Sequence, residues 1–330
     1  MMPDIKSVLR CPSCGRSDKL SSDDDSRQPT ITRIQCSHCD RVFVKGSDGF
    51  FVLRENPVAQ QKSFQICETH DYYANRHFKD FVLGSINRGL RATLERLRPA
   101  VVLDIGCGNG ATSRNLHGTY EHYYGVEPSD IPPVQEVCVA PQVVMLHNDP
   151  EKVLPIQSGA VDLAMFLGSY QLIQNRETVL KEAWRAVRPE GFLLVCMSNA
   201  DFWLKRVLRS SGLNRWTRGK AANVVFCDHG AASLVKEVLA LLPDAELERC
   251  AADYCSLPSR PYWLRHVYRS PKIVAFLDSV FRALTSMVKD SGSNMIVVFQ
   301  KNCAPAAETQ LPVKQDHGFT ELPAQIPANA

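Results

Sequence analysis

Residues 101–110, with the sequence VVLDIGCGNG, have the composition of a ligand-binding turn. The apolar run that ends at Asp104 predicts a buried parallel strand, and a helix is expected to begin near Ala111. The glycines between them allow a tight turn and let bare backbone approach a ligand. The pattern is typical of a nucleotide-type cofactor site, although Gly106, Gly108 and Ala111 taken alone also fit a dinucleotide fingerprint.

A carboxylate follows at a spacing that suits a nucleoside. Glu127 ends the segment EHYYGVE about twenty residues after the turn, where a second strand should end. There its carboxylate could accept hydrogen bonds from both ribose hydroxyls of either cofactor class. Two further segments continue the series, HNDPEKVLPIQSGAVDLAMF at 147–166 and LKEAWRAVRPEGFLLV at 180–195.

Together these segments resemble the class I S-adenosylmethionine-dependent methyltransferases over roughly 100 residues, which is more specific than any single motif. The resemblance implies an α/β fold with a Rossmann-like, doubly wound, seven-stranded and mostly parallel sheet, and S-adenosyl-L-methionine as cofactor. It assigns the methionine end of the cofactor to the glycine turn, the ribose to Glu127 and the adenine amino group to Asp149. The implied cofactor-binding residues are Asp104, Gly106, Cys107, Gly108, Gly110, Glu127, Asn148, Asp149 and Leu167.

Two positions in this series leave alternatives open. Asp149 precedes Pro150 and could be a turn residue that contacts no ligand. Related enzymes often carry a histidine shortly after the strand expected at 161–166, where this chain has Gln171. The sequence therefore assigns no general base at that point.

Proton transfer would have to use other side chains. His229, in the segment CDHG at an expected helix start, is our candidate general base, because the pKa of an imidazole lies near neutral pH. Tyr72 and Tyr73 lie where related enzymes often place an aromatic ring over the cofactor or acceptor. A capping histidine and two tyrosines that only pack on the core are the alternatives. Methyl transfer also proceeds by alignment and desolvation alone.

Four cysteines near the N-terminus form two CxxC pairs, Cys11 with Cys14 and Cys36 with Cys39, separated by residues 15–35. The spacing predicts a ribbon in which four thiolates hold one Zn²⁺. Four protein ligands leave no open coordination position, so the site would be structural and would stabilise a segment too small to fold alone. Disulfides or an unoccupied redox pair are the alternatives, and the expected cytoplasmic location disfavours both.

The composition predicts a globular enzyme with appended segments. Hydrophobic residues make up 45% and charged residues 22% of the chain, ordinary for a globular protein. We expect neither a membrane span nor a signal peptide, and the net charge of +3 is too small to indicate a polyanionic partner. The expected parts are a zinc ribbon (1–54), a linker with helices over the cofactor pocket (55–98), a methyltransferase core (99–302) with insertions at about 201–228 and 252–293, and a disordered tail (303–330).

The acceptor has two main interpretations. The insertions contain basic and aromatic segments at 201–220 and 260–272, which suit the walls of an acceptor site. In the favoured interpretation the enzyme methylates a small polar, glycan or lipid-linked molecule, with O-methylation expected.

In the other interpretation the enzyme methylates a base of rRNA or tRNA, because a CPxCG ribbon before such a core resembles the bacterial rRNA guanine N1-methyltransferases. The acidic run at 23–25 would repel phosphate and disfavours RNA. A non-catalytic zinc-ribbon interaction protein is the third interpretation. Oligomeric state is left open.

Overall fold

The structure is a computed structural model that describes residues 5–18, 20–22, 32–46, 50–53, 84–128, 142–202, 229–254 and 294–303, with residues 272, 273, 276, 279, 280, 283 and 292. Tyr72, Tyr73, most of both expected insertions and nearly all of the expected tail lie outside these ranges.

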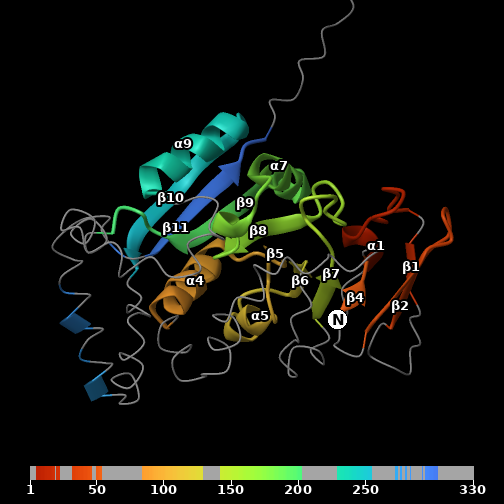
Figure 1. Ribbon diagram of the computed structural model, residues 1–330, viewed down its shortest axis with the longest axis horizontal. Coiled ribbons are helices and arrows are strands. Elements are labelled where there is room, and N and C mark those ends of the chain that lie inside the picture. Colours follow the sequence, from red (N-terminus) through yellow and green to blue (C-terminus); the bar gives the residue numbers. More distant parts are fainter. Residues whose placement is uncertain are drawn as a thin grey trace, which may run out of the picture.

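A single large sheet forms the centre of the described part of the chain (Figure 1). Its strand order is β10-β11-β9-β8-β5-β6-β7-β4. The bounds are β4 (Phe51–Val52), β5 (Val101–Ile105), β6 (His122–Glu127), β7 (Val143–His147), β8 (Val161–Leu167), β9 (Val187–Ser198), β10 (Ala245–Tyr254) and β11 (Asn294–Lys301). Strands β4 to β9 run parallel, and β11 is antiparallel to both of its neighbours. This confirms the expected α/β class with a mostly parallel sheet.

Helices cover both faces of the sheet because strand side chains alternate between them. Leu103 and Ile105 of β5 belong to the apolar cluster that includes α7 (Arg176–Ala186) and α9 (Ala231–Leu241). Val102 faces the other cluster, which includes α4 (Gly84–Leu97). The short α5 (Ala111–Asn115) lies on the same side as α4 (Figure 1). The sheet is therefore doubly wound, with its core divided into two layers.

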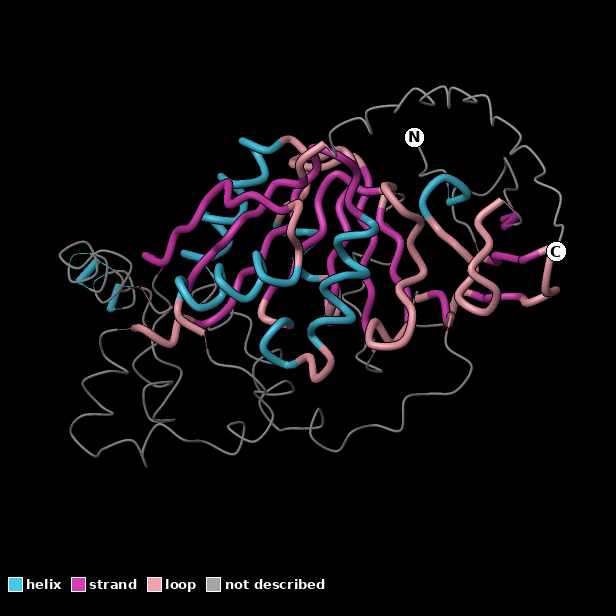
Figure 2. The backbone as a smooth tube through the Cα atoms, turned by 90° about the horizontal axis from the view of Figure 1, so that it is seen from above, coloured by secondary structure: helices cyan, strands magenta, loops and turns pink. Residues whose placement is uncertain are grey.

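The cysteine pairs belong to a small antiparallel sheet beside the large one. Its order is β1-β2-β3, with bounds β1 (Leu20–Ser22), β2 (Arg33–Cys36) and β3 (Val42–Val44), and a short helix α1 (Ile5–Val8) precedes it. Figure 2 shows this ribbon at one end of the molecule, beyond the edge of the large sheet.

The large sheet contains eight strands among the described residues, which corrects the expected seven. The expected ribbon (1–54) includes β4, yet β4 pairs in parallel with β7 of the large sheet, and Lys45 forms an isolated bridge to Phe51. Phe50 is fully buried and stacks on His147, with ring centroids 4.2 Å apart. Phe50, Phe51 and Leu53 are buried whereas Val52 is exposed, which suits the edge of a large sheet better than a thin ribbon.

Candidate functional site

A glycine turn follows β5 and leads into α5. Gly106, Gly108 and Gly110 all have positive φ, at 76°, 57° and 75°, a region that side chains other than glycine rarely adopt. A Cβ at Gly106 would lie no more than 3.0 Å from Ser169, which follows β8. The turn thus brings the ends of β5 and β8 together, and glycine is required for the closest approach.

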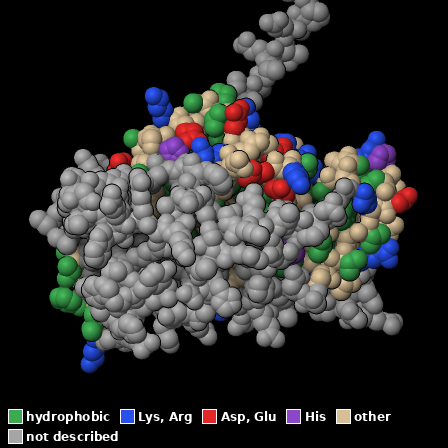
Figure 3. Space-filling view, viewed as in Figure 1, with side chains coloured by type: hydrophobic (Ala, Val, Ile, Leu, Met, Phe, Trp, Pro, Cys, Tyr) green, Lys and Arg blue, Asp and Glu red, His purple; other side chains and the backbone are tan. Residues whose placement is uncertain are grey.

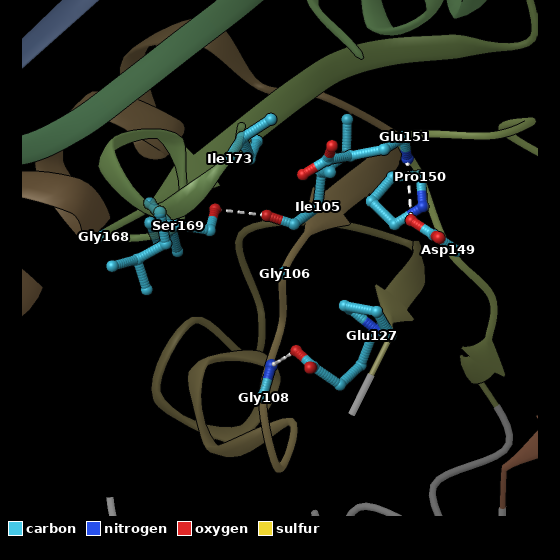
Figure 4. Close-up of a pocket in the computed structure, with 13 residues that line it drawn as sticks. Ile105, Gly106, Gly108, Glu127, Asp149, Pro150, Glu151, Gly168, Ser169 and Ile173 are labelled. Atoms are coloured by element: carbon cyan, nitrogen blue, oxygen red, sulfur yellow. Dashed lines mark hydrogen bonds between the residues drawn. The ribbon is translucent and has the colours of Figure 1, made fainter. Parts of the chain in front are cut away.

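The first cavity lies at the carboxyl ends of β5, β6, β7 and β8, where ligands bind in open parallel sheets. Its volume is about 190 Å³, and Gly106, Glu127, Asp149, Leu167 and Ile173 are among the residues that line it. Figure 4 shows Glu127 beside the glycine turn, with Asp149 coming from the next strand end. The site therefore gathers residues from four successive strand ends.

Glu127 is held in place by the turn itself. Its Oε2 accepts a hydrogen bond of 2.8 Å from the backbone N–H of Gly108, and the side chain is only 3% exposed. The turn is anchored to the same strand end, since the N–H of Gly106 donates to the Val126 carbonyl at 2.8 Å. A carboxylate fixed in this way is preorganised to accept hydrogen bonds from a diol.

A second cavity, of about 300 Å³, lies across the glycine turn from the first. Gly106, Leu167 and Gly168 line both cavities, so the two cavities adjoin each other at these residues. The polar side chains that line only the second cavity are Asn87, Asp104, Asn109, Thr112, Gln171, Ser198 and Asn294. Apart from Asp104, these described side chains are uncharged.

Asp104 is fully buried in the wall of the second cavity. Burial raises its pKa from 3.8 to about 7, opposed by the hydrogen bond from the Tyr123 hydroxyl and reinforced by the charge of Glu127. Tyr123 donates to Oδ2, whereas Oδ1 has no hydrogen-bond partner within the described ranges. A buried carboxylate oxygen without a donor is costly, and a cationic donor in the cavity would compensate it.

Asn148 and Asp149 lie at the end of β7 with different roles. Asp149 lines the first cavity, and its Oδ1 accepts the Glu151 N–H at 3.0 Å. The Asn148 amide donates to the carbonyls of Val153 and Asp149, and its residue lines neither cavity. Asn148 therefore holds the turn that presents Asp149, and its expected contact with adenine stays a prediction.

His229 lines neither cavity. Its Nδ1 lies 3.2 Å from the Ser233 hydroxyl, and its Nε2 lies 2.6 Å from Glu237 Oε2. Glu237 also accepts a hydrogen bond of 2.9 Å from the Tyr170 hydroxyl and forms an ion pair with Arg176. His229 thus belongs to a hydrogen-bond and ion-pair network with residues of α9. Its role as general base stays a prediction, as do the roles of Tyr72 and Tyr73.

Several polar residues of the second cavity were not assigned from the sequence. Ser198 ends β9, and its hydroxyl donates to Gln171 Oε1 at 2.7 Å. The rule that ligands bind at carboxyl strand ends could have identified Ser198. Asn87 on α4 and Asn294 at the start of β11 carry no local signal, because only packing brings them to the cavity.

The four cysteines of the ribbon come together in one cluster. Their Sγ atoms all lie within 4.8 Å of one another, with 3.6 Å between Cys11 and Cys39 and 3.7 Å between Cys14 and Cys36. A tetrahedron with metal–sulfur bonds of about 2.3 Å has edges of about 3.8 Å, so the cluster fits a zinc ion.

The doubly wound sheet, glycine turn and strand-end carboxylate are typical of an α/β domain with a nucleoside-type cofactor site. Residues 103–195 match the family model of a methyltransferase domain. This part of the chain therefore agrees with the methyltransferase resemblance found in its sequence.

A curated relative and several solved structures are similar to this chain. The 2-methyl-6-phytyl-1,4-hydroquinone methyltransferase of Synechocystis is 26% identical over 188 residues, which cover 53% of this chain and 56% of that protein. The chain thus spans little more than half the length of this relative.

Among solved structures, a possible histamine N-methyltransferase of Thermotoga maritima has 17% identity and a TM-score of 0.48, covering 73% of this chain and 98% of that chain. The plantazolicin methyltransferase BamL, solved with a substrate analogue and S-adenosylhomocysteine (SAH), has 12% identity and a TM-score of 0.48, covering 74% and 94%.

Within the described ranges, no helix combines the length and apolar character needed to cross a lipid bilayer.

Proposed function

We propose that the protein is an S-adenosylmethionine-dependent methyltransferase that acts on a small polar, glycan or lipid-linked acceptor, with a hydroxyl oxygen as the methylated atom. The observation that carries this proposal is the pair of adjoining cavities. Glu127 lines the first, and Asp104, whose Oδ1 has no hydrogen-bond donor among the described residues, lines the second. The family match over 103–195 supports the same chemistry.

Each carboxylate has a proposed part of the cofactor to bind. Glu127, held by the Gly108 N–H, accepts hydrogen bonds from the ribose hydroxyls. Asp149 accepts a hydrogen bond from the adenine amino group, and Asp104 Oδ1 accepts one from the amino group of the methionine portion. When bound, the cofactor supplies an activated methyl group on a sulfonium, so the protein must mainly align the acceptor and exclude water.

The second cavity is the proposed entrance for the acceptor. Its uncharged amide and hydroxyl side chains, among them Gln171 and Ser198, suit hydrogen bonds to a neutral polar molecule. The relative from Synechocystis is named for a hydroquinone that carries a phytyl chain, which agrees with a small or lipid-linked acceptor. The described part of the face in Figure 3 carries interspersed acidic and basic side chains, with no broad basic patch for RNA.

The cysteine cluster is the proposed structural zinc site, with Cys11, Cys14, Cys36 and Cys39 as its four ligands. Elemental analysis of the purified chain should find one zinc per molecule. Cys36→Ser should lose the metal, whereas Cys303→Ser, at an exposed cysteine far along the chain, should retain it. Full zinc content in the first variant would contradict the assignment.

Calorimetry with SAH tests the cofactor site directly. Glu127→Gln removes the charge that strengthens two hydrogen bonds and should weaken binding about 10- to 100-fold. Glu177→Gln, on the exposed surface of α7, is the matched control and should bind normally. The proposal is wrong if the unmodified chain binds neither SAH nor S-adenosylmethionine.

The acceptor class is tested by incubating cell extract with enzyme and isotopically labelled S-adenosylmethionine. Mass spectrometry should find the label in low-mass or glycolipid fractions. Label in RNA bases, with salt-dependent RNA binding, would establish the rRNA or tRNA alternative. Bound SAH without transfer to any fraction would favour the non-catalytic interpretation.

A further inference from the structure

The wall of the first cavity continues into the surface on which the ribbon lies. Asp149, Pro150 and Glu151 line the cavity just after β7 (Figure 4). The chain then runs from 152 to 160 through turns and one isolated bridge, without a helix or strand of its own. A segment with so little internal hydrogen bonding depends on its neighbours for a fixed conformation.

The ribbon supplies part of this support through backbone pairing, beside Arg185 of α7, which donates to the Ile156 carbonyl at 2.7 Å. The Gln157 N–H donates to the Val8 carbonyl at 2.8 Å, and the Arg10 N–H donates to the Pro155 carbonyl at 3.1 Å. Between them, Leu9 forms an antiparallel bridge with Ile156. Residues 8–10 therefore act as a short additional strand along 155–157.

Side chains reinforce this contact on both sides. Arg10 donates from Nε to the Leu154 carbonyl at 3.1 Å and forms an ion pair of 2.6 Å with Glu182 on α7. Gln157 Nε2 donates to the Leu9 carbonyl at 2.9 Å. Arg10 thus links the cavity segment to a helix of the methyltransferase domain.

The cysteine cluster lies immediately beside this contact. Cys11 follows Arg10, and both Cys11 and Leu154 are fully buried in one continuous apolar cluster. The first knuckle is closed by hydrogen bonds from the Cys11 N–H to the Arg16 carbonyl and from the Gly15 N–H to the Cys11 carbonyl, both 2.8 Å. A knuckle this small keeps its shape only while a metal holds its thiolates.

From these contacts we infer that the cysteine ribbon braces the adenine side of the cofactor pocket, with Arg10 as a positioning residue, so that metal binding and cofactor binding reinforce each other. The inference rests on the proposed function for the identity of the two ligands. The metal fixes the knuckle, the knuckle fixes residues 8–10, and these residues hold the segment that directly follows the turn with Asp149. Because coupling is reciprocal, cofactor binding must tighten metal binding by the same factor.

Calorimetry on the full chain tests the coupling in one direction. Zinc-loaded protein should bind SAH about five- to tenfold more tightly than protein treated with a chelator, within the usual range of coupling between sites. In the other direction, saturating SAH should lower the dissociation constant for zinc by the same factor, measured by competition with a chromophoric chelator.

Arg10→Gln tests whether the contact between the ribbon and the pocket affects cofactor binding when the metal is still bound. This variant should keep its zinc but bind SAH severalfold more weakly, with a raised KM for the cofactor and an almost unchanged kcat. Arg16→Gln, at an exposed arginine of the same knuckle, should match the unmodified chain in both zinc content and SAH affinity.

The outcomes distinguish this inference from the proposed function. Equal SAH affinity in folded protein with and without zinc, or in Arg10→Gln, overturns the bracing. If chelation unfolds the chain, zinc affinity that does not change with SAH overturns it instead. Failure of the zinc-loaded, unmodified chain to bind SAH would count against the proposed cofactor itself.

Discussion

At the scale of single residues, Asp104 combines burial with an oxygen that has no donor among the described residues. Its titratable neighbours are Tyr123, Cys107 and Glu127. The pKa values of Tyr123 and Cys107 are raised by burial first and by the charge of Asp104 second, so both side chains stay neutral near pH 7. Asp104 therefore titrates closer to neutrality than either Tyr123 or Cys107.

The affinity for SAH should depend on pH through Asp104. Its pKa of about 7 in the ligand-free protein means that the carboxyl is largely protonated at pH 6, whereas a bound amino group favours the carboxylate. Binding should then release a proton below pH 7, and affinity should rise up to about tenfold per pH unit before levelling off above pH 7. Calorimetry in buffers of different ionisation enthalpy measures this release.

The same pKa predicts how pH affects folding of the ligand-free protein. Because the folded pKa of about 7 lies above the ordinary 3.8, the folded state retains a proton that the unfolded state has released. The contribution of Asp104 to stability therefore falls as pH rises from about 4 to about 7. Asp104→Asn should remove both pH effects and weaken SAH binding, and a variant that kept the binding profile would contradict the assignment.

Gly106 allows a prediction that separates strain from close approach. Gly106→Ala would strain a φ of 76° and also collide with Ser169, so we expect a loss of at least about 2 kcal/mol in the free energy of unfolding and no measurable SAH binding. Gly118 has a φ of 86° but open space around it. Gly118→Ala should therefore lose about 1–2 kcal/mol, from strain alone, and bind SAH normally. Urea unfolding and calorimetry compare the two variants.

At the scale of elements, the first part of β9 carries local strain, because its pairing with β8 is irregular between Val187 and Phe192. Glu190 lies in this irregular part and has a φ of 63°, in the left-handed region that favours glycine. Lys301 of β11 donates to the carbonyls of Trp184 and Val187 at 2.7 Å and 2.9 Å. The start of β9 is thus held from β11 even though Glu190 is conformationally unfavourable.

Replacing Glu190 with glycine should relieve that strain. Glu190→Gly removes about 1–2 kcal/mol of left-handed strain but makes the unfolded chain more flexible, so we expect a net stabilisation of about 0.5 kcal/mol. Glu190→Ala keeps the strained φ and should not stabilise the protein. Chemical denaturation of both variants measures the difference in their free energies of unfolding. Equal stability would show that the strain at Glu190 is negligible.

At the scale of the whole molecule, the ribbon and the methyltransferase domain share one apolar cluster. Leu9 is 1% exposed and lies in the same cluster as Ile156 and Phe166. The parallel pairing of β4 with β7 adds a second connection at the same edge of the large sheet. We therefore expect the described parts to unfold together and not as separate units.

Leu9→Ala tests this cooperativity. Truncation of a fully buried leucine should lower the free energy of unfolding by about 2–5 kcal/mol. The loss should appear in a single transition when fluorescence and circular dichroism are followed together. Val44→Ala, at a side chain that is 56% exposed on β3, should change stability by less than about 0.5 kcal/mol. Two separate transitions would contradict a shared core.

Features that depend on short spacings could be predicted from the amino-acid sequence alone. The glycine turn after β5, the position of Glu127 at the end of β6 and the two cysteine knuckles all follow from residues a few positions apart or one strand–helix unit apart. Left-handed glycines and paired thiolates have few structural alternatives, which is why such local patterns are informative.

The folded structure was needed to identify which distant segments meet. It moved β4 from the ribbon to the large sheet, set residues 8–10 along 155–157, and brought Asn87 and Asn294 to the second cavity. It also joined His229 to Glu237, neither of which lines either cavity. These contacts arise from burying apolar side chains between elements far apart in the chain. A local sequence pattern does not identify which distant element will cover a given apolar surface.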